Sequence, residues 1–210
     1  MAAAKATASV RGRGRQLLLT AARDIFAERG YKGTSTRDIA ERAGVTEVMI
    51  FRHFGTKANL FQEAVVAPFT LFIQHYLADY RSREHGIRSP YEEGLDLYTG
   101  LFEVLRGERE VLLALMAARQ FDDLPAAAAS QVEQAFADVL TVIEEVVGTE
   151  SVERGFSDFD LRPTVRAMFA MVLSVALHGD WMGLRHDKSY RHVIDAMTTL
   201  TVRGLQVPEG

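Results

Sequence analysis

The stretch TEVMIFRHF, residues 46–54, combines side chains that suit contact with nucleic-acid bases. If it forms a short helix, its outward side carries Glu47, Val48, Met49, Arg52 and His53. Arginine can donate two hydrogen bonds to guanine, and glutamate can accept a hydrogen bond from cytosine. An aliphatic side chain can contact the methyl group of thymine. A helix that carries such side chains fits the DNA major groove. An ordinary helical hairpin shares this pattern, so both interpretations stay open here.

A preceding helix and a glycine turn must position this stretch. Ser35 and Asp38 have the spacing of a capping box, which predicts a helix that runs through Ala43. Gly44 then ends this helix, because glycine adopts the left-handed backbone conformation that other residues resist. The chain therefore turns sharply before residue 46.

The second helix is expected to pack against the first across this turn. Thr46 can cap it, and Ile50 and Phe54 are expected to face back toward Ile39. Ala40 is small enough to let the two helices cross closely. The arrangement is a helix-turn-helix.

Groups that bind phosphate surround the same region. Helices that begin at Ser35, Thr46 and Thr56 offer free backbone N–H groups, and Lys57 follows directly. The segment RGRGR, residues 11–15, adds three arginines that could reach DNA or remain a solvated tail.

The charge of the chain is unevenly distributed. Residues 1–60 hold 11 basic and 5 acidic side chains, a net +6, whereas residues 61–210 hold 13 and 23, a net −10. This asymmetry favours a polyanionic partner for the N-terminal part, although an uneven solvated surface would also explain it.

Composition excludes several classes of protein. The 210 residues are 48% hydrophobic and 25% charged, which is typical of a globular protein, and they include no cysteine. Disulfides, thiolate nucleophiles and cysteine metal sites are therefore excluded, and a cytoplasmic location is expected. The longest apolar stretch, residues 168–177, is too short to span a membrane. The N-terminus lacks the apolar core of a secretory signal, and residues 1–10 are expected to be a flexible arm.

Helical periodicity dominates the whole chain and predicts an all-α protein of about nine helices. Breaks are expected where glycine, proline and small polar residues cluster. Pro68 falls inside the helical pattern of residues 61–80, which predicts one bent helix there.

At residues 17–65 the chain resembles the DNA-binding domain of the TetR family of transcriptional regulators. The motifs AARDIFAERGY, TSTRDIAERAGV, HF at 53–54 and TKANLF at 56–61 occur in unbroken register. The resemblance implies an all-α homodimer, in which a three-helix helix-turn-helix domain binds a palindromic operator. A larger C-terminal bundle would dimerise and hold a small-molecule effector. The implied domains are residues 11–60 and 61–210.

The resemblance also implies which residues meet DNA. Positions that would contact bases or adjacent phosphates are Arg37, Thr46, Glu47, Val48, Met49 and Arg52. Those expected to contact phosphates are Thr34, Ser35, His53 and Lys57, and Arg15 and Thr36 are also expected to bind DNA.

Two of these positions carry qualifications. Family members usually have tyrosine at position 51, but Phe51 has no hydroxyl, so it is expected to pack and at most to touch the DNA backbone. Glu47 lies in the first turn of its helix, where the helix dipole stabilises an acid without any base contact.

The C-terminal region is expected to serve dimerisation and effector binding. Segments 160–182 and 189–205 are apolar on more than one face, which suits a four-helix dimer interface or a monomer core. The bulky and semi-polar residues expected to line a largely apolar effector pocket are Phe72, His75, Tyr76, Tyr98, Phe102, Met116, Phe121, Met171, His178 and Trp181. A fully packed core without a ligand remains the alternative.

A helical enzyme or metalloprotein is the competing class. Carboxylate-bridged metal bundles need Glu-x-x-His pairs, and no histidine here has a glutamate three residues before it. The sequence also lacks a glycine-rich phosphate loop and a serine nucleophile elbow. No catalytic residue, metal or cofactor is therefore predicted.

Overall fold

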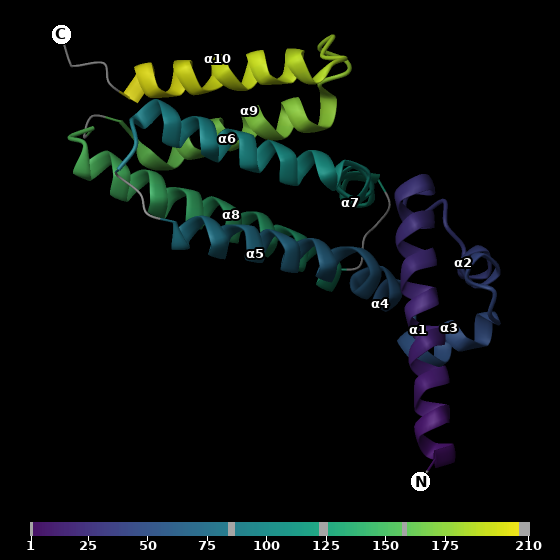
Figure 1. Ribbon diagram of the computed structural model, residues 1–210. Coiled ribbons are helices and arrows are strands. Elements are labelled where there is room, and N and C mark those ends of the chain that lie inside the picture. Colours follow the sequence, from purple (N-terminus) through teal and green to yellow (C-terminus); the bar gives the residue numbers. More distant parts are fainter. Residues whose placement is uncertain (1, 84–86, 122–125, 157–158, 206–210) are drawn as a thin grey trace. The chain divides into compact units, whose positions relative to one another are not determined.

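The computed structural model describes residues 2–83, 87–121, 126–156 and 159–205, and all regular structure in these ranges is helical. Ten α-helices and one π-helical turn occur there (Figure 1). Three of these segments, α4 (Lys57–Phe61), η1 (Gln62–Val66) and α5 (Ala67–Ser82), follow one another without a break. Counted as one bent helix, they leave nine helices over the described ranges. The all-α prediction is confirmed.

A π-helical turn interrupts this composite helix close to Pro68. Because proline has no N–H group, it cannot donate the hydrogen bond that an α-helix needs at its position. The π-helical turn ends at Val66, two residues before the proline, and the N–H of Ala67 donates to the carbonyl of Gln62. The regular α-helix is therefore interrupted by a π-helical turn in the region where the sequence predicts a bend.

The chain divides into two compact units, and the first contains residues 1–72 and 110–134. Its N-terminal part consists of α1 (Ala2–Arg29), α2 (Thr36–Ala43), α3 (Glu47–Phe54) and α4. The aromatic core of this part joins Phe26 to Phe61, whose ring centroids are 4.9 Å apart, and Tyr31 to Phe61 at 5.1 Å. The remaining helices of this unit are α7 (Arg109–Phe121), apart from its first residue, and the start of α8 (Ala126–Glu153).

The apolar pattern of α1 predicts its buried side well. Leu18, Ile25 and Phe26 are almost fully buried. Leu17 belongs to the same apolar pattern, but 47% of it is exposed because it lies one residue away from the buried stripe. The N-terminus also differs from the expected flexible arm: α1 already begins at Ala2, and its alanine-rich start favours helix.

The second unit contains residues 73–109 and 135–210. In it α6 (Pro90–Gly107) packs against α9 (Leu161–His178) and α10 (Asp187–Leu205), and the three helices lie side by side in Figure 1. Ser89 and Glu92 form a capping box that starts α6, and proline occupies its first turn. The core of this unit includes Leu97, Tyr98, Leu105, Val165, Val172 and Leu177.

Candidate nucleic-acid interface and effector region

Helix α3 separates a buried face from an exposed one. Ile50 and Phe54 are buried, as their spacing predicts. On the other side Val48 is 73% exposed and Phe51 51% exposed, and Arg52 is exposed as well. Thr46 occupies the N-cap position of α3, but its side chain makes no capping hydrogen bond. The expected side-chain cap is therefore not formed. The exposed face of α3 therefore carries apolar, cationic and hydroxyl groups.

Helix α2 and its glycine turn have the geometry expected from the sequence. The Oγ of Ser35 accepts from the N–H of Asp38 at 3.1 Å, and the N–H of Ser35 donates to Asp38 Oδ2 at 3.3 Å. Hydrogen bonds from the side chain and from the backbone N–H of Ser35 to the Asp38 carboxylate lower the pKa of this carboxyl below its usual value. Gly44 has φ 66° and ψ 31°, and its N–H donates to the carbonyls of Ala40 and Glu41. The left-handed glycine therefore closes α2 and starts the turn into α3.

A hydrogen bond between side chains joins the N-termini of α2 and α3. The hydroxyl of Thr36 donates to Glu47 Oε1 at 2.5 Å. Both residues are half-buried, so this bond is partly shielded from water. Glu47 thus has a structural role in setting the position of α3, and a base contact would have to compete with it.

The N-terminal part of α1 packs closely on α3. A Cβ atom added at Gly14 would lie 2.7 Å from Met49 Cε, well inside van der Waals contact. The Arg15 guanidinium pairs with Glu63 and lies 5.2 Å from the centre of the Phe54 ring. Arg15 is therefore tied to its own unit rather than placed on a mobile arm.

The predicted phosphate contacts fall into different environments. Ser35 is exposed at the N-cap of α2, as such a contact requires. Lys57 Nζ lies 4.3 Å from the centre of the Tyr31 ring, which places its charge beside the N-terminus of α4. The Nε2 of His53 is buried and has no hydrogen-bond partner among the described residues.

Thr34 differs from the expectation of a phosphate contact. Only 2% of this residue is exposed, and its hydroxyl donates to the carbonyl of Gly30 at 2.7 Å. A hydroxyl used in this way stabilises the turn after α1 and cannot reach a phosphate. Arg37 and Arg52, in contrast, are exposed.

The residues expected to line an effector pocket are dispersed. Tyr98 is a core residue: its hydroxyl lies 2.8 Å from Thr201 Oγ1, and burial raises its pKa to about 12. His178 stacks on Trp181, which is 84% exposed. Phe72 and Met116 are partly exposed, and His75 is exposed. The side chain of Phe121 lies outside the described residues, and Met171 is half-buried on α9.

Tyr76 and Gly100 form a close contact between α5 and α6. A Cβ atom at Gly100 would lie 2.3 Å from the Tyr76 hydroxyl oxygen, so only glycine leaves room for this side chain. The hydroxyl is buried without a hydrogen-bond partner among the described residues, and burial raises its pKa above the usual value. Such an unsatisfied hydroxyl is a candidate contact for a ligand.

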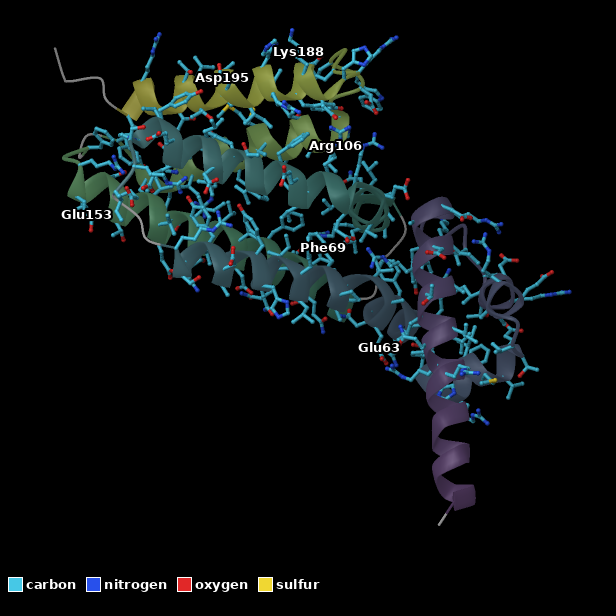
Figure 2. All side chains as sticks on the ribbon, in the orientation of Figure 1. Glu63, Phe69, Arg106, Glu153, Lys188 and Asp195 are labelled. Atoms are coloured by element: carbon cyan, nitrogen blue, oxygen red, sulfur yellow. The ribbon has the colours of Figure 1, made fainter. Side chains whose placement is uncertain are left out.

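Two hollows occur in the second unit. The first is an apolar cleft between α5, α6, α8, α9 and α10. The second is a groove between α6 and α10 that Phe102 and Tyr190 line. Arg106 projects from α6 toward α10 there, with its guanidinium 4.2 Å from the centre of the Tyr190 ring (Figure 2). Of the ten predicted pocket residues, Phe102 alone contributes to either hollow, and the ten remain a prediction.

Several partners that shape these sites were not apparent from the sequence. Tyr31 and Glu63 act through contacts that only the folded chain forms. The close contact at Gly14 could have been inferred from the sequence, because a glycine inside a helical pattern often marks a close approach between helices. Neither a metal-binding cluster nor a helix able to cross a membrane occurs among the residues described.

Comparisons with known proteins agree on the N-terminal region. Residues 18–64 match the model of a family described as bacterial regulatory proteins, tetR family. The HTH-type transcriptional repressor Rv3405c of Mycobacterium tuberculosis is 58% identical over 43 residues, which are 20% of this chain and 23% of that protein. The chain thus aligns with less than a quarter of the length of this relative.

Longer similarities extend into the second unit. The HTH-type transcriptional repressor KstR2 of Mycolicibacterium smegmatis is 26% identical over 150 residues, 71% of this chain and 68% of that protein. The structure of the transcriptional regulator FadR from Bacillus subtilis in complex with stearoyl-CoA matches with a TM-score of 0.66 and 18% identity. The match covers 90% of this chain and 98% of the FadR chain. At this identity the match establishes a common fold.

Proposed function

The chain belongs to the TetR family of transcriptional regulators, and we propose that it is a repressor that a small effector releases from its operator. The observation that carries the proposal is helix α3, whose buried face is fixed by Ile50 and Phe54 while Val48 and Arg52 face solvent. A helix held in this way can enter the major groove without rearrangement.

DNA recognition would use two groups of side chains. Arg37, Arg52 and Val48 are exposed and would read bases, since arginine suits guanine and valine suits a thymine methyl group. Ser35 and Lys57 would bind phosphates at the N-termini of α2 and α4, which fixes the register of the protein on the duplex. Phe51 would pack beside the DNA backbone, and Thr36 would hold Glu47.

Dimerisation through α9 and α10 would place two recognition helices on one operator. Ala167 and Ala170 on α9 and Ala196 on α10 are exposed small residues, which permit close helix packing, and Leu200 is 68% exposed. In such a homodimer the two α3 helices would enter successive major grooves about 34–36 Å apart on a pseudo-palindrome.

Effector binding would act on this spacing. The FadR structure shows that a protein of this fold can hold stearoyl-CoA, and an apolar ligand in the second unit would play the corresponding part here. A ligand shifts the conformational equilibrium only by its differential affinity for the two states. The composite helix of α4, η1 and α5, bent at Pro68, is the proposed lever. Equal angles between α5 and α3 in ligand-bound and DNA-bound structures would exclude it.

The test begins with genomic DNA. Fragments enriched by the purified protein from its own genome should share a pseudo-palindrome, and labelled duplexes should then bind in a salt-dependent way. Arg52→Ala should weaken binding to the recovered operator more than to scrambled DNA, while Arg81→Ala, outside the interface, should leave both unchanged. Indifference to every duplex at low ionic strength would refute the proposal. We expect the protein to act in the cytoplasm.

A further inference from the structure

Helix α1 contacts the recognition helix α3 at two points. Gly14 is buried, and a Cβ atom added there would lie 2.7 Å from Met49 Cε, so Met49 in the first turn of α3 packs directly against this glycine. The guanidinium of the next residue, Arg15, lies 5.2 Å from the centre of the Phe54 ring. Phe54 is the last residue of α3. Two consecutive residues of α1 thus contact the beginning and the end of α3.

A carboxylate of η1 holds Arg15 in this position. The guanidinium forms an ion pair with Glu63, the second residue of the π-helical turn, which Figure 2 labels. The side chains of Arg15 and Glu63 are only 41% and 39% exposed, so the pair is partly shielded from water. Phe54 is buried, and all three residues belong to the first unit. One side chain therefore joins α1, η1 and the end of α3.

This environment fits a structural contact better than a phosphate contact. Arg15 and Glu63 together carry no net charge, and a phosphate that approached the guanidinium would also meet the carboxylate and be repelled by it. Arginine suits the position because its planar guanidinium can lie over an aromatic ring while its N–H groups bind a carboxylate. The contact with DNA that the family resemblance implies for Arg15 would require this pair to break.

We propose that Arg15 is a positioning residue, which holds α3 against α1 and η1 for DNA recognition and does not itself contact the duplex. The inference rests on the proposed function, because it concerns how α3 is presented to an operator. Base contacts carry the sequence preference and need a fixed geometry, whereas phosphate contacts are the same for every sequence. Loss of Arg15 should therefore weaken binding to the operator more than binding to scrambled DNA.

The substitution Glu63→Gln gives opposite results for the two roles of Arg15. If the pair positions α3, this variant should bind a labelled operator about threefold more weakly in fluorescence anisotropy. If Arg15 instead bound a phosphate, loss of Glu63 would free the guanidinium for DNA and remove a repulsive charge, so binding would become tighter.

A second ion pair of the first unit provides the matched control. Glu28 pairs with Arg42 at 3.0 Å and joins α1 to α2, and both side chains are about as exposed as those of Arg15 and Glu63. Glu28→Gln removes the same charge as Glu63→Gln and should bind the operator within about twofold of wild type. Tighter operator binding by Glu63→Gln than by Glu28→Gln would overturn the proposal.

Salt dependence tests the role of Arg15 directly. Arg15→Gln should weaken operator binding about tenfold, through loss of the ion pair and of the ring contact, and leave the slope of log K against log salt unchanged. A lost phosphate contact would reduce this slope by about 0.9. Arg42→Gln removes the same charge from the same unit and should stay within about twofold of wild type. A slope reduced by about 0.9 in Arg15→Gln would refute the positioning role.

The double variant tests whether Arg15 and Glu63 act through one contact. In Arg15→Gln/Glu63→Gln the loss of Glu63 should change operator affinity by less than about twofold, because its partner is already absent. Losses that multiply fully in the double variant would show that the two residues act independently and would contradict the proposal.

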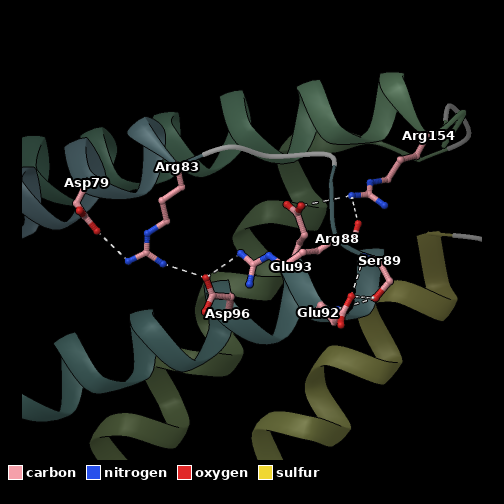
Figure 3. A network of polar contacts seen from close by, with 8 residues as sticks. All are labelled: Asp79, Arg83, Arg88, Ser89, Glu92, Glu93, Asp96 and Arg154. Atoms are coloured by element: carbon pink, nitrogen blue, oxygen red, sulfur yellow. Dashed lines mark hydrogen bonds and ion pairs between the residues drawn. The ribbon is translucent and has the colours of Figure 1, made fainter.

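Hydrogen exchange followed by mass spectrometry tests the position of α3 without DNA. Amides of residues 49–54 should exchange about threefold faster in Arg15→Gln and in Glu63→Gln than in wild type, because α3 would open more often. Arg83→Gln is the remote control, because Arg83 pairs with Asp96 at 2.9 Å in the second unit (Figure 3). It should leave this exchange unchanged. Unchanged exchange of α3 in both first-unit variants would refute the positioning role.

These measurements separate the inference from the proposed function. A wild-type protein that binds no duplex would refute the regulatory function, and faster exchange of α3 in Arg15→Gln would still show that Arg15 holds this helix. A protein that binds its operator but binds it more tightly after Glu63→Gln would refute the positioning role alone.

Discussion

Replacing Gly44 by alanine isolates the backbone contribution of the turn between α2 and α3. A Cβ atom at this position would meet no atom within 4 Å, so the substitution introduces no side-chain clash. What remains is the left-handed backbone, with φ 66°, which costs an L-residue about 1–2 kcal/mol. For a chain of this size we expect the melting temperature to fall by about 2–8 °C.

The assay is thermal and urea unfolding followed by far-UV circular dichroism. Gly12→Ala is the matched control, because Gly12 is helical and its added Cβ would also meet no atom within 4 Å. Alanine at this position should stabilise the protein by about 0.5–1 kcal/mol. Gly44→Asn should lose less stability than Gly44→Ala, because asparagine tolerates the left-handed backbone conformation. A Gly44→Ala protein as stable as wild type would show that the turn does not need its left-handed glycine.

Three further substitutions test contacts of the two units. Lys57→Ala should weaken binding to all DNA sequences and reduce the salt slope by about 0.9 for each lost phosphate contact, whereas Arg37→Ala should also relax base preference in a binding-site selection. Gly14→Val should weaken operator binding in gel shifts, because its added carbons press on the recognition helix, and full affinity would show that this close contact is dispensable. Tyr98→Phe should cost about 1 kcal/mol of unfolding free energy through loss of the hydrogen bond to Thr201. The raised pKa of Tyr98 means that its stabilising effect is complete below about pH 10 and is lost as the pH rises toward about 12. Unfolding midpoints of Tyr98→Phe should therefore fall less steeply in this window than those of wild type.

Prediction from sequence succeeded where structure depends on neighbours along the chain. The capping box at Ser35 and the glycine at 44 use hydrogen bonds and dihedral angles that span at most five residues, so their residue types were sufficient. For Thr34 the family resemblance implied a phosphate contact. In the folded chain, however, its hydroxyl donates to the carbonyl of Gly30.

The predicted effector residues illustrate why pockets are harder to predict. Aromatic and methionine side chains at helical spacing have the same pattern whether they fill a core, as Tyr98 does, or lie on the surface, as Trp181 does. The apolar cleft of the second unit is instead lined mainly by aliphatic residues that come from α5, α6, α8, α9 and α10. No periodicity relates residues on different helices, so sequence spacing carries no signal for the space between them.

The sequence by itself determined that the chain is helical, where α3 lies, and which face of α3 is buried. These properties follow from periodicity and short-range hydrogen bonds. Tertiary structure alone decided that Arg15 pairs with Glu63, that Met49 rests against Gly14, and that Tyr76 lies against Gly100. Each of these depends on side chains from different helices meeting in space, which the order of residues along one helix does not specify.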